Sequence, residues 1–538
     1  MRDTISKIGR TLEKSGVSVL ACIGLILGLG LTYYSAFYTE LCEWETGISR
    51  TWRDHAVLNI IIFLMAAVLC VLLRRGLERS RKNSRMADRV EGVLLVLVLI
   101  YCVAAGGIWV ALSHVEPYAD ARSVCVVAEC FLEGDFPMQP PTYMGYCPHQ
   151  YGIVFVLHML FALFGSGNYE AWQYMNVLLF PLLIFAGYRI VKLIYEEPGP
   201  GVLYLLLVPG YLPLFLYLPY VYGDFASVVC GMVVIWQTVV YCKKGNYSAV
   251  VWGTLAAVFG CLVRKNTWIV VIAAILVLLL CSLSRARMKL LIMAIVMPLF
   301  IVGADRGVKL YYEQLSGQQI SPGIPSVCYI MMGLEDGEKG PGWFNGSNYR
   351  AYISTDYDYE AAERYGREQV DIRLRELWHN KSYALDFFRR KILTQWNMPD
   401  CYSISETMYF DREETELPGI VQWVYFGGGR DRLEDFMDRY QFVIYAGFVL
   451  AVLGFLRDDR KEIENGILLI AIVGGFLFSV LWEAMSRYVF AYVVYMIPLA
   501  AAGMWQLKDF AAAGRNGFHR DRNKKDGNEK DRNDRGEN

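Results

Sequence analysis

Long apolar stretches, separated by short polar or charged segments, make up most of the chain. Each is near the length that an α-helix needs to cross about 30 Å of hydrocarbon. They lie at 17–38, 56–73, 92–112, 171–188, 201–218, 224–241, 249–263, 267–283, 288–303, 441–456, 466–481 and 488–504. A further stretch, 151–164, is shorter and carries His158. The pattern predicts an all-α polytopic membrane protein with about twelve transmembrane helices.

Basic residues between these stretches predict the orientation of the chain. The N-terminal segment and the loop 74–89 are the most basic, and both are cytoplasmic if two spans separate them. The later basic segments, around 243–244, 285–289 and 457–461, fall on the same side only if 151–164 does not cross. We therefore expect 151–164 to be a juxtamembrane or re-entrant helix at the outer face, with both termini in the cytoplasm.

The same threading divides the chain into five parts. We expect two N-terminal spans and a basic loop at 1–90, a transmembrane core with an external loop (113–170) at 91–305, and an α-rich extracytoplasmic domain at 306–439. Three C-terminal spans follow at 440–507, and 508–538 is a polar tail predicted to be disordered. The domain at 306–439 contains an amphipathic helical pair that opens near Asp358, and it has no nucleotide loop or nucleophile motif. It is therefore expected to cap a site rather than to act as an independent enzyme.

Composition excludes a soluble enzyme, because 55% of the 538 residues are hydrophobic and one water-facing fold could not bury them all. The net charge of −1 points to neither acidic nor basic partners. Three of the thirteen cysteines, Cys125, Cys130 and Cys147, share one polar loop. A disulfide there requires that the loop face an oxidising compartment.

Three charged residues follow the third apolar stretch within one short segment: Glu116, Asp120 and Arg122. A carboxylate that is partly shielded from water at a membrane edge can accept the proton of an attacking hydroxyl, so this segment is a candidate for a general base. The other interpretation is a solvated helix end.

Cations on the outer side, where they are usually depleted, suggest an anionic ligand. Arg264 and Lys265 join two spans there, and Arg487 opens the last span. Arginine can bind a lipid phosphate through two hydrogen bonds. The alternative is that these side chains snorkel toward anionic headgroups. Asp224 lies at the outward end of a predicted helix, where it either contacts the ligand or caps the helix N-terminus. His149 is either a turn residue or a substrate contact.

This arrangement resembles the GT-C superfamily of polyprenyl-phosphate-sugar-dependent glycosyltransferases, especially the protein O-mannosyltransferases and lipid A aminoarabinose transferases of the family 39 type. The resemblance spans about 92–504. It rests on the acidic first external loop "EPYADA", the juxtamembrane segment "CPHQYGIVFVLHMLFALFG", the acidic helix lip at Asp224, the basic turn at Arg264 and Lys265, and the late "SRY" with Arg487 and Tyr488.

The resemblance implies that Asp120 is the base that activates the acceptor and that the reaction inverts the anomeric carbon. The donor would be a hexosyl or pentosyl polyprenyl phosphate, and the acceptor an extracytoplasmic glycan, lipid or protein. The residues expected to bind substrate are Glu116, Arg122, His149, Asp224, Arg264, Lys265, Arg487 and Tyr488. We expect no cofactor, no metal centre and no nucleic-acid partner, with a requirement for a divalent metal left open.

Two alternatives belong to other classes. A flippase or transporter of lipid-linked glycans would carry polar residues through its helix centres, and the apolar stretches here are nearly free of them. A non-catalytic scaffold of the cell envelope would have no need of Asp120.

Overall fold

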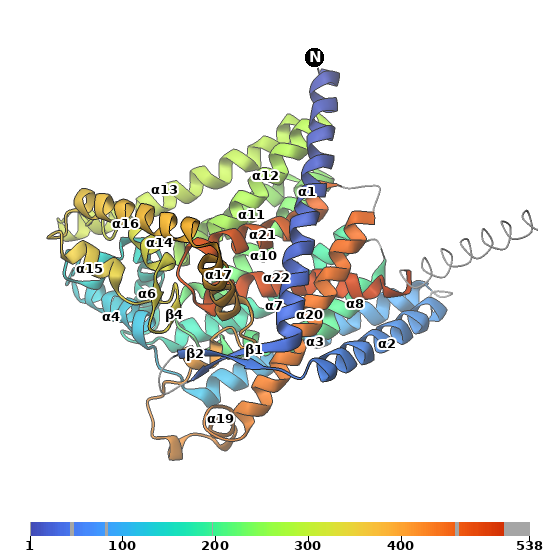
Figure 1. Cartoon of the computed structure of the whole chain (residues 1–538), viewed down its shortest axis with the longest axis horizontal. Helices are drawn as coiled ribbons and strands as arrows, with labels where there is room; N and C mark the ends of the chain where they lie inside the picture. Colours follow the sequence, from blue (N-terminus) through green and yellow to red (C-terminus); the bar gives the residue numbers. More distant parts are fainter. Residues whose placement is uncertain (1, 44–47, 81–83, 196, 458–461, 510–538) are drawn as a thin grey trace, which may run out of the picture.

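The computed structural model describes residues 2–43, 48–80, 84–195, 197–457 and 462–509, and it is almost entirely helical (Figure 1). Most of the basic loop at 74–89 lies within these ranges. The predicted disordered tail lies outside them from residue 510 onward.

Ten helical segments within the described ranges are long and apolar enough to cross a membrane. Their α-helices are α1 (Arg2–Phe37), α2 (Ala56–Ser80), α3 (Ser84–Ser113), α7 (Glu170–Ile194), α10 (Gly223–Lys244), α12 (Thr267–Arg285), α13 (Leu291–Ser316), α20 (Gly429–Arg457), α21 (Ile467–Leu481) and α22 (Phe490–Trp505). Short 3-10 turns precede three of them: η4 (Met288–Leu290), η6 (Ile463–Gly466) and η7 (Ser486–Val489). These segments coincide with ten of the twelve predicted stretches, so the polytopic α-helical fold is confirmed.

The other two predicted stretches form shorter helices. The stretch 249–263 becomes α11 (Tyr247–Val263), a helix of 17 residues. The stretch 201–218 does not form one helix but divides into α8 (Pro198–Leu207), η3 (Val208–Gly210) and α9 (Pro213–Leu216). Pro209 and Pro213 explain the break, because proline has no backbone N–H to continue the helical ladder.

The predicted juxtamembrane segment is a separate helix, α6 (Tyr151–Phe164). It follows α4 (Ala119–Glu133), α5 (Tyr143–Tyr146) and η2 (Pro148–Gln150), and it packs mainly against α4, α11 and α13. All thirteen cysteines, including those of this region, are free thiols in the structure.

Between α13 and α20 the chain forms a set of short helices, which we call the cap. Its elements are α14 (Ser326–Leu334), β3 (Asp336–Gly337), β4 (Gly340–Pro341), α15 (Ser347–Ile353), α16 (Tyr359–His379), α17 (Lys381–Trp396), α18 (Ser403–Glu406), η5 (Glu414–Glu416) and α19 (Gly419–Tyr425). The Asp358 side chain caps α16 by accepting a hydrogen bond from the Ala361 amide at 3.0 Å. The predicted helical pair that opens near Asp358 is therefore confirmed.

An antiparallel hairpin of β1 (Tyr38–Glu43) and β2 (Ile48–Arg53) joins α1 to α2. It docks on the cap, because the Glu40 amide donates to the Asn397 carbonyl at 3.1 Å and the Asn397 side chain donates to the Tyr38 carbonyl at 2.7 Å. In Figure 1 the hairpin lies at the end of α1 opposite the labelled N-terminus. The two N-terminal spans are thus tied to the cap by their connecting turn.

Two buried amides on α7 hold the irregular chain that leads into α10. Gln173 donates to the Val115 and Pro219 carbonyls, both at 2.8 Å, and Asn176 donates to the Leu218 carbonyl at 3.0 Å. Backbone carbonyls that are not in a helix need such partners when they are buried. The amides therefore fix the segment from which Tyr220 and Tyr222 project.

Candidate active site

A cavity of about 740 Å³ lies between the cap and the end of the helix bundle that carries the β1–β2 hairpin. Its walls come from α4, η2, the α11–α12 turn, α14, α18 and the segment between α21 and α22. Aromatic rings line much of it: Tyr118, Tyr143, Tyr222, Tyr329, Trp343, Phe344, Tyr349, Tyr402, Tyr409, Trp482 and Tyr488. A largely aromatic cavity with a few convergent charges is typical of a site for a small molecule.

Asp120 lies in the first turn of α4 and faces this cavity. The chain enters the helix through Tyr118, which has extended backbone, and Ala119, which has a positive φ of 49°. The Tyr118 ring stacks on Tyr409 of the cap, with 3.5 Å between the ring centroids. This contact and the sharp turn hold Asp120 at the cavity wall.

Two largely buried ion pairs contribute to the same site. Arg264 of the α11–α12 turn contacts Asp224 of α10, with 3.1 Å between Nη1 and Oδ2. Arg487 of η7 contacts Glu406 of α18, with 2.7 Å between Nη1 and Oε1. Each guanidinium thus has a carboxylate partner, which offsets the cost of removing its charge from water.

The two guanidinium groups also share the same aromatic rings. Arg264 lies 5.4 Å from the Tyr222 ring centroid and 5.3 Å from that of Tyr488. Arg487 lies 5.5 Å and 5.4 Å from the same two centroids. Because the face of a ring attracts cations, Tyr222 and Tyr488 hold the arginines side by side despite their like charge.

Two close backbone approaches place the α11–α12 turn beside its neighbours. A Cβ atom on Gly223 would lie 2.1 Å from the Val263 carbonyl oxygen, and one on Gly152 would lie 2.1 Å from the Leu262 carbonyl oxygen. Only glycine fits such contacts. These two glycines let α10 and α6 reach the end of α11, just before Arg264.

Lys265 and His149 lie at the cavity wall beside this turn. Lys265 forms an ion pair with Asp305 of α13, which also contacts Lys309 at 3.0 Å. Shielding of the His149 ring from bulk water inside the cavity and the positive charges of Lys265, Arg264 and Lys309 together lower the pKa of His149 to about 4. The imidazole is therefore neutral near pH 7.

The structure also brings two carboxylates to the cavity that sequence reasoning missed, Glu406 and Glu483. Burial raises the pKa of Glu406, with Arg487 opposing the shift. Burial raises the pKa of Glu483 to about 7, and the Tyr488 hydroxyl donates to its Oε2 at 2.9 Å. Glu483 lies just before the "SRY" motif in the sequence, so its proximity to that motif could have identified it as a candidate site residue. Glu406 follows a cap loop without a motif.

The predicted site residues divide into three groups. Asp120, His149, Arg264, Lys265, Arg487 and Tyr488 line the cavity. Asp224 lines a smaller pocket of about 20 Å³ together with Arg264, Arg487 and Tyr488. Glu116 and Arg122 are not among the lining residues, because Glu116 lies at the backbone pairing with Tyr409 and Arg122 is exposed on α4.

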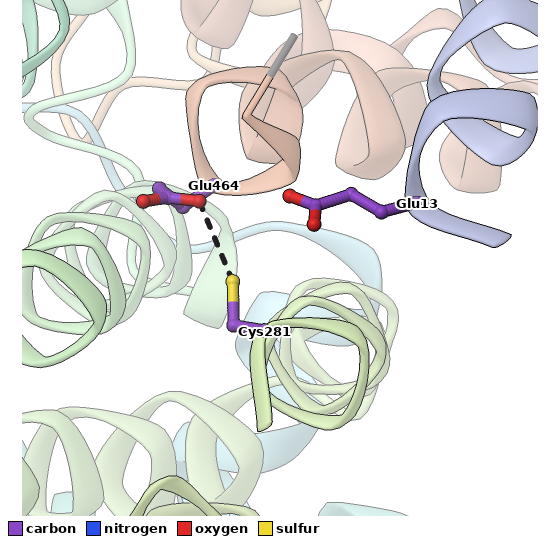
Figure 2. A group of neighbouring side chains, drawn as sticks. All are labelled: Glu13, Cys281 and Glu464. Atoms are coloured by element: carbon purple, nitrogen blue, oxygen red, sulfur yellow. Dashed lines mark hydrogen bonds between the residues drawn. The ribbon is translucent and has the colours of Figure 1, made fainter. Parts of the chain in front are cut away.

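A group of potential metal ligands lies at the other end of the bundle, away from the cavity. Figure 2 shows Glu13 of α1, Cys281 of α12 and Glu464 of η6, whose ligand atoms all lie within 4.8 Å of one another. Glu464 already receives two hydrogen bonds from Arg285, at 2.6 and 2.8 Å, and one from the Cys281 thiol at 3.4 Å. Its charge is therefore compensated by the protein itself.

Fold and cavity together define a polytopic α-helical membrane protein with a ligand-sized site at one end of its bundle. The chain belongs to the family described as conserved hypothetical integral membrane protein, whose model matches residues 18–506. No curated protein matches the sequence.

Similar solved structures include the Archaeoglobus fulgidus oligosaccharyltransferase in complex with Zn and sulfate, at 12% identity and a TM-score of 0.41, with 76% of this chain and 49% of that chain covered. ArnT from Cupriavidus metallidurans is similar in its form bound to undecaprenyl phosphate, at 13% identity and a TM-score of 0.31, and in its apo form, at 13% and 0.30. Both comparisons cover 76% of this chain and 77% of ArnT. This chain thus spans about half the length of the first of these proteins.

Proposed function

We propose that this protein is a membrane glycosyltransferase that moves a sugar from a polyprenyl-phosphate donor to an acceptor hydroxyl on the extracytoplasmic side. The observation that carries the proposal is the cavity that Asp120 shares with three cations, Arg264, Lys265 and Arg487. Asp120, the adjacent Arg264 and Lys265, and Arg487 come from three segments far apart in the sequence. A carboxylate and a cluster of cations in one cavity suit a reaction that removes a proton from one substrate and releases a phosphate from the other.

In this mechanism Asp120 accepts the proton of the acceptor hydroxyl while the hydroxyl oxygen attacks the anomeric carbon. The bond between that carbon and the phosphate oxygen breaks, and its electron pair leaves with the polyprenyl phosphate. Attack from the side opposite the leaving group inverts the anomeric carbon. Arg264, Lys265 and Arg487 stabilise the negative charge that the phosphate gains.

The geometry supports a dedicated phosphate region. Arg264 and Arg487 are both largely buried, and they line both the cavity and the small pocket behind it. Arginines fixed by carboxylates and rings need little reorganisation when an anion arrives, which is what electrostatic stabilisation of a leaving group requires. The donor brings its own activated leaving group, so the mechanism needs no nucleotide site.

The experiment is sugar transfer by the purified full-length protein in detergent, with a panel of polyprenyl-phosphate sugars and the variants Asp120→Asn and Glu133→Gln. Asp120→Asn keeps the side-chain shape and removes the proton acceptor, so transfer should fall by a factor of roughly 10² to 10⁴. Glu133 is exposed at the other end of the same helix, and its variant should transfer like wild type.

Donor binding and thermal stability of Asp120→Asn should stay near wild type, since this residue is assigned to proton transfer. Full transfer by Asp120→Asn would remove the base from the mechanism. Failure of the wild-type protein to transfer any sugar of the panel, together with movement of a donor lipid across vesicles, would favour the flippase alternative.

A further inference from the structure

Glu483 is a half-buried carboxylate at the cavity wall, and the mechanism above leaves it unused. Its main chain is fixed on both sides by the cap. Gln395 of α17 donates to the Glu483 carbonyl at 3.1 Å, and the next amide, that of Ala484, donates to the Gly342 carbonyl at 2.7 Å. A residue held this firmly keeps its carboxyl group at one place in the cavity.

Tyr488 connects Glu483 to the phosphate region. Its hydroxyl lies 2.9 Å from Glu483 Oε2, and its ring lies 5.3 Å from the guanidinium carbon of Arg264 and 5.4 Å from that of Arg487. A hydroxyl both donates and accepts, so a protonated Glu483 could donate to Tyr488 while Tyr488 donates onward. The pair therefore extends from Glu483, the proton source, toward Arg264 and Arg487, the arginines assigned to the leaving phosphate.

The charged and titratable groups that face Glu483 come from five elements. They are Arg487 and Tyr488 of η7, Arg264 of the α11–α12 turn, Asp120 of α4, Lys391 of α17 and Tyr329 of α14. Burial and the Asp120 charge raise the Glu483 pKa, while Arg487, the Tyr488 hydrogen bond and Arg264 oppose the shift, and the resulting pKa is about 7. Glu483 thus holds its proton in a large fraction of molecules at neutral pH.

We propose that Glu483 and Tyr488 form a proton-donating pair that protonates the departing polyprenyl phosphate. This inference rests on the proposed glycosyltransferase function and adds a general acid to it. As the bond from the anomeric carbon to the phosphate oxygen breaks, the Tyr488 hydroxyl gives its proton to that oxygen and takes the Glu483 proton in its place. Glu483 ends as a carboxylate, and the polyprenyl phosphate leaves with one more proton.

The proton balance closes over one turnover. Asp120 gains the acceptor proton, Glu483 loses one, and the phosphate product carries one away. Both carboxylates face the same cavity, so transfer from Asp120 to Glu483 through water restores the starting state. Two carboxyl groups in different surroundings thus take opposite roles, one as base and one as acid.

The test is the pH dependence of transfer by the full-length protein between pH 5.5 and 9, roughly two pH units to either side of the Glu483 pKa. Wild-type kcat should fall as the pH rises above about 7, because Glu483 then loses the proton that it must donate. Glu483→Gln should lower kcat by a factor of roughly 10² or more below pH 7 and remove this alkaline decline, with the KM for donor near wild type. Glu483→Asp should restore part of kcat and shift the decline to another pH.

The Tyr488→Phe variant tests the path of the proton and is independent of how well Glu483→Gln folds. It should lower kcat while the variant still binds polyprenyl phosphate, since both arginines remain. Glu133→Gln is the matched carboxylate control and should keep the wild-type profile.

Several outcomes would overturn the inference. One is an alkaline decline that persists unchanged in Glu483→Gln or in Glu483→Asp. Another is a Glu483→Gln variant whose KM rises while kcat stays within about threefold of wild type, which would make Glu483 a binding residue. Wild-type protein that transfers no sugar would overturn the proposed function itself, whereas wild-type transfer with an unchanged Glu483→Gln profile overturns only the acid.

Discussion

The two ends of the helix bundle each contain buried carboxylates beside arginine, but the arginines of one end border a large cavity, whereas Glu464 at the other end is fully enclosed. At the cavity end, Arg264 and Arg487 pair with Asp224 and Glu406 and still border about 740 Å³ of space. At the other end, Arg285 binds Glu464 through two hydrogen bonds, and Glu464 is completely buried.

The difference lies in what surrounds each pair. Glu464 is part of η6 and accepts a hydrogen bond from the Cys281 thiol. The neighbouring Ile463 amide donates to Glu13 at 3.0 Å, so protein groups surround this carboxylate. Arg264 and Arg487 instead lie against aromatic rings that form a cavity wall. A buried ion pair is therefore not by itself a sign of a site. It becomes one where its cation borders a space that a ligand can enter.

The closed end should respond to mutation in stability and not in activity. Glu464→Gln removes the charge and leaves Arg285 with only the exposed Glu462, at 3.8 Å, as a carboxylate partner. Loss of the buried partner of an ion pair typically costs about 3–5 kcal/mol. Thermal unfolding in detergent should show this loss, while transfer per folded molecule stays at the wild-type level. The double variant Arg285→Gln with Glu464→Gln should recover most of the stability. A drop in transfer by the folded single variant would mean that the two ends are coupled.

At the open end, stability and donor binding should separate. Arg264→Gln alone should weaken polyprenyl-phosphate binding by roughly 1.5–3 kcal/mol, as expected for a lost charge-assisted hydrogen bond, and should also destabilise the fold by leaving Asp224 unpaired. Adding Asp224→Asn should restore thermal stability without restoring donor affinity. Binding to labelled polyprenyl phosphate and thermal unfolding measure the two effects. If the double variant binds donor like wild type, Arg264 is only a structural partner of Asp224.

Glu40 of the hairpin is a further buried carboxylate, held by the hydroxyls of Thr51, at 2.6 Å, and Thr394, at 3.4 Å. Burial raises its pKa from 4.5 to about 7, with both hydroxyls opposing the shift. The folded state then binds the proton more tightly than the unfolded state. Its contribution to stability is complete below pH 4.5 and is lost as the pH rises through 7.

Glu40→Gln should therefore stabilise the protein above pH 7, on the order of 1–3 kcal/mol, and have less effect at pH 5. Thermal unfolding of both proteins between pH 5 and pH 8.5, roughly the range around this pKa, measures the difference. Equal pH dependence in wild type and Glu40→Gln would show that the Glu40 carboxylate does not drive it. Transfer should be unaffected, since Glu40 is not among the residues that line the cavity.

The sequence by itself determined the helical membrane fold and several residues of the candidate site. A helix in hydrocarbon must satisfy its own backbone, so the lengths of the apolar stretches predicted ten of the spanning segments within the described ranges. The amphipathic spacing after Asp358 predicted the helical pair of the cap in the same way. Asp120, Arg264, Lys265 and Arg487 stood out because charges at the ends of apolar stretches need a reason.

Only the tertiary structure decided which of these charges share a cavity. Glu406 reaches Arg487 across 81 positions, and the four-residue helix α18 that carries Glu406 is too short for a periodic pattern to reveal it. Glu116 and Arg122 are as close to Asp120 in sequence as any candidate, yet they lie outside the cavity lining because the turn at Ala119 and the start of α4 direct them elsewhere. The tertiary structure also decided the raised pKa of Glu483. That shift comes from burial beneath the cap, and burial depends on contacts between segments that are distant in the sequence.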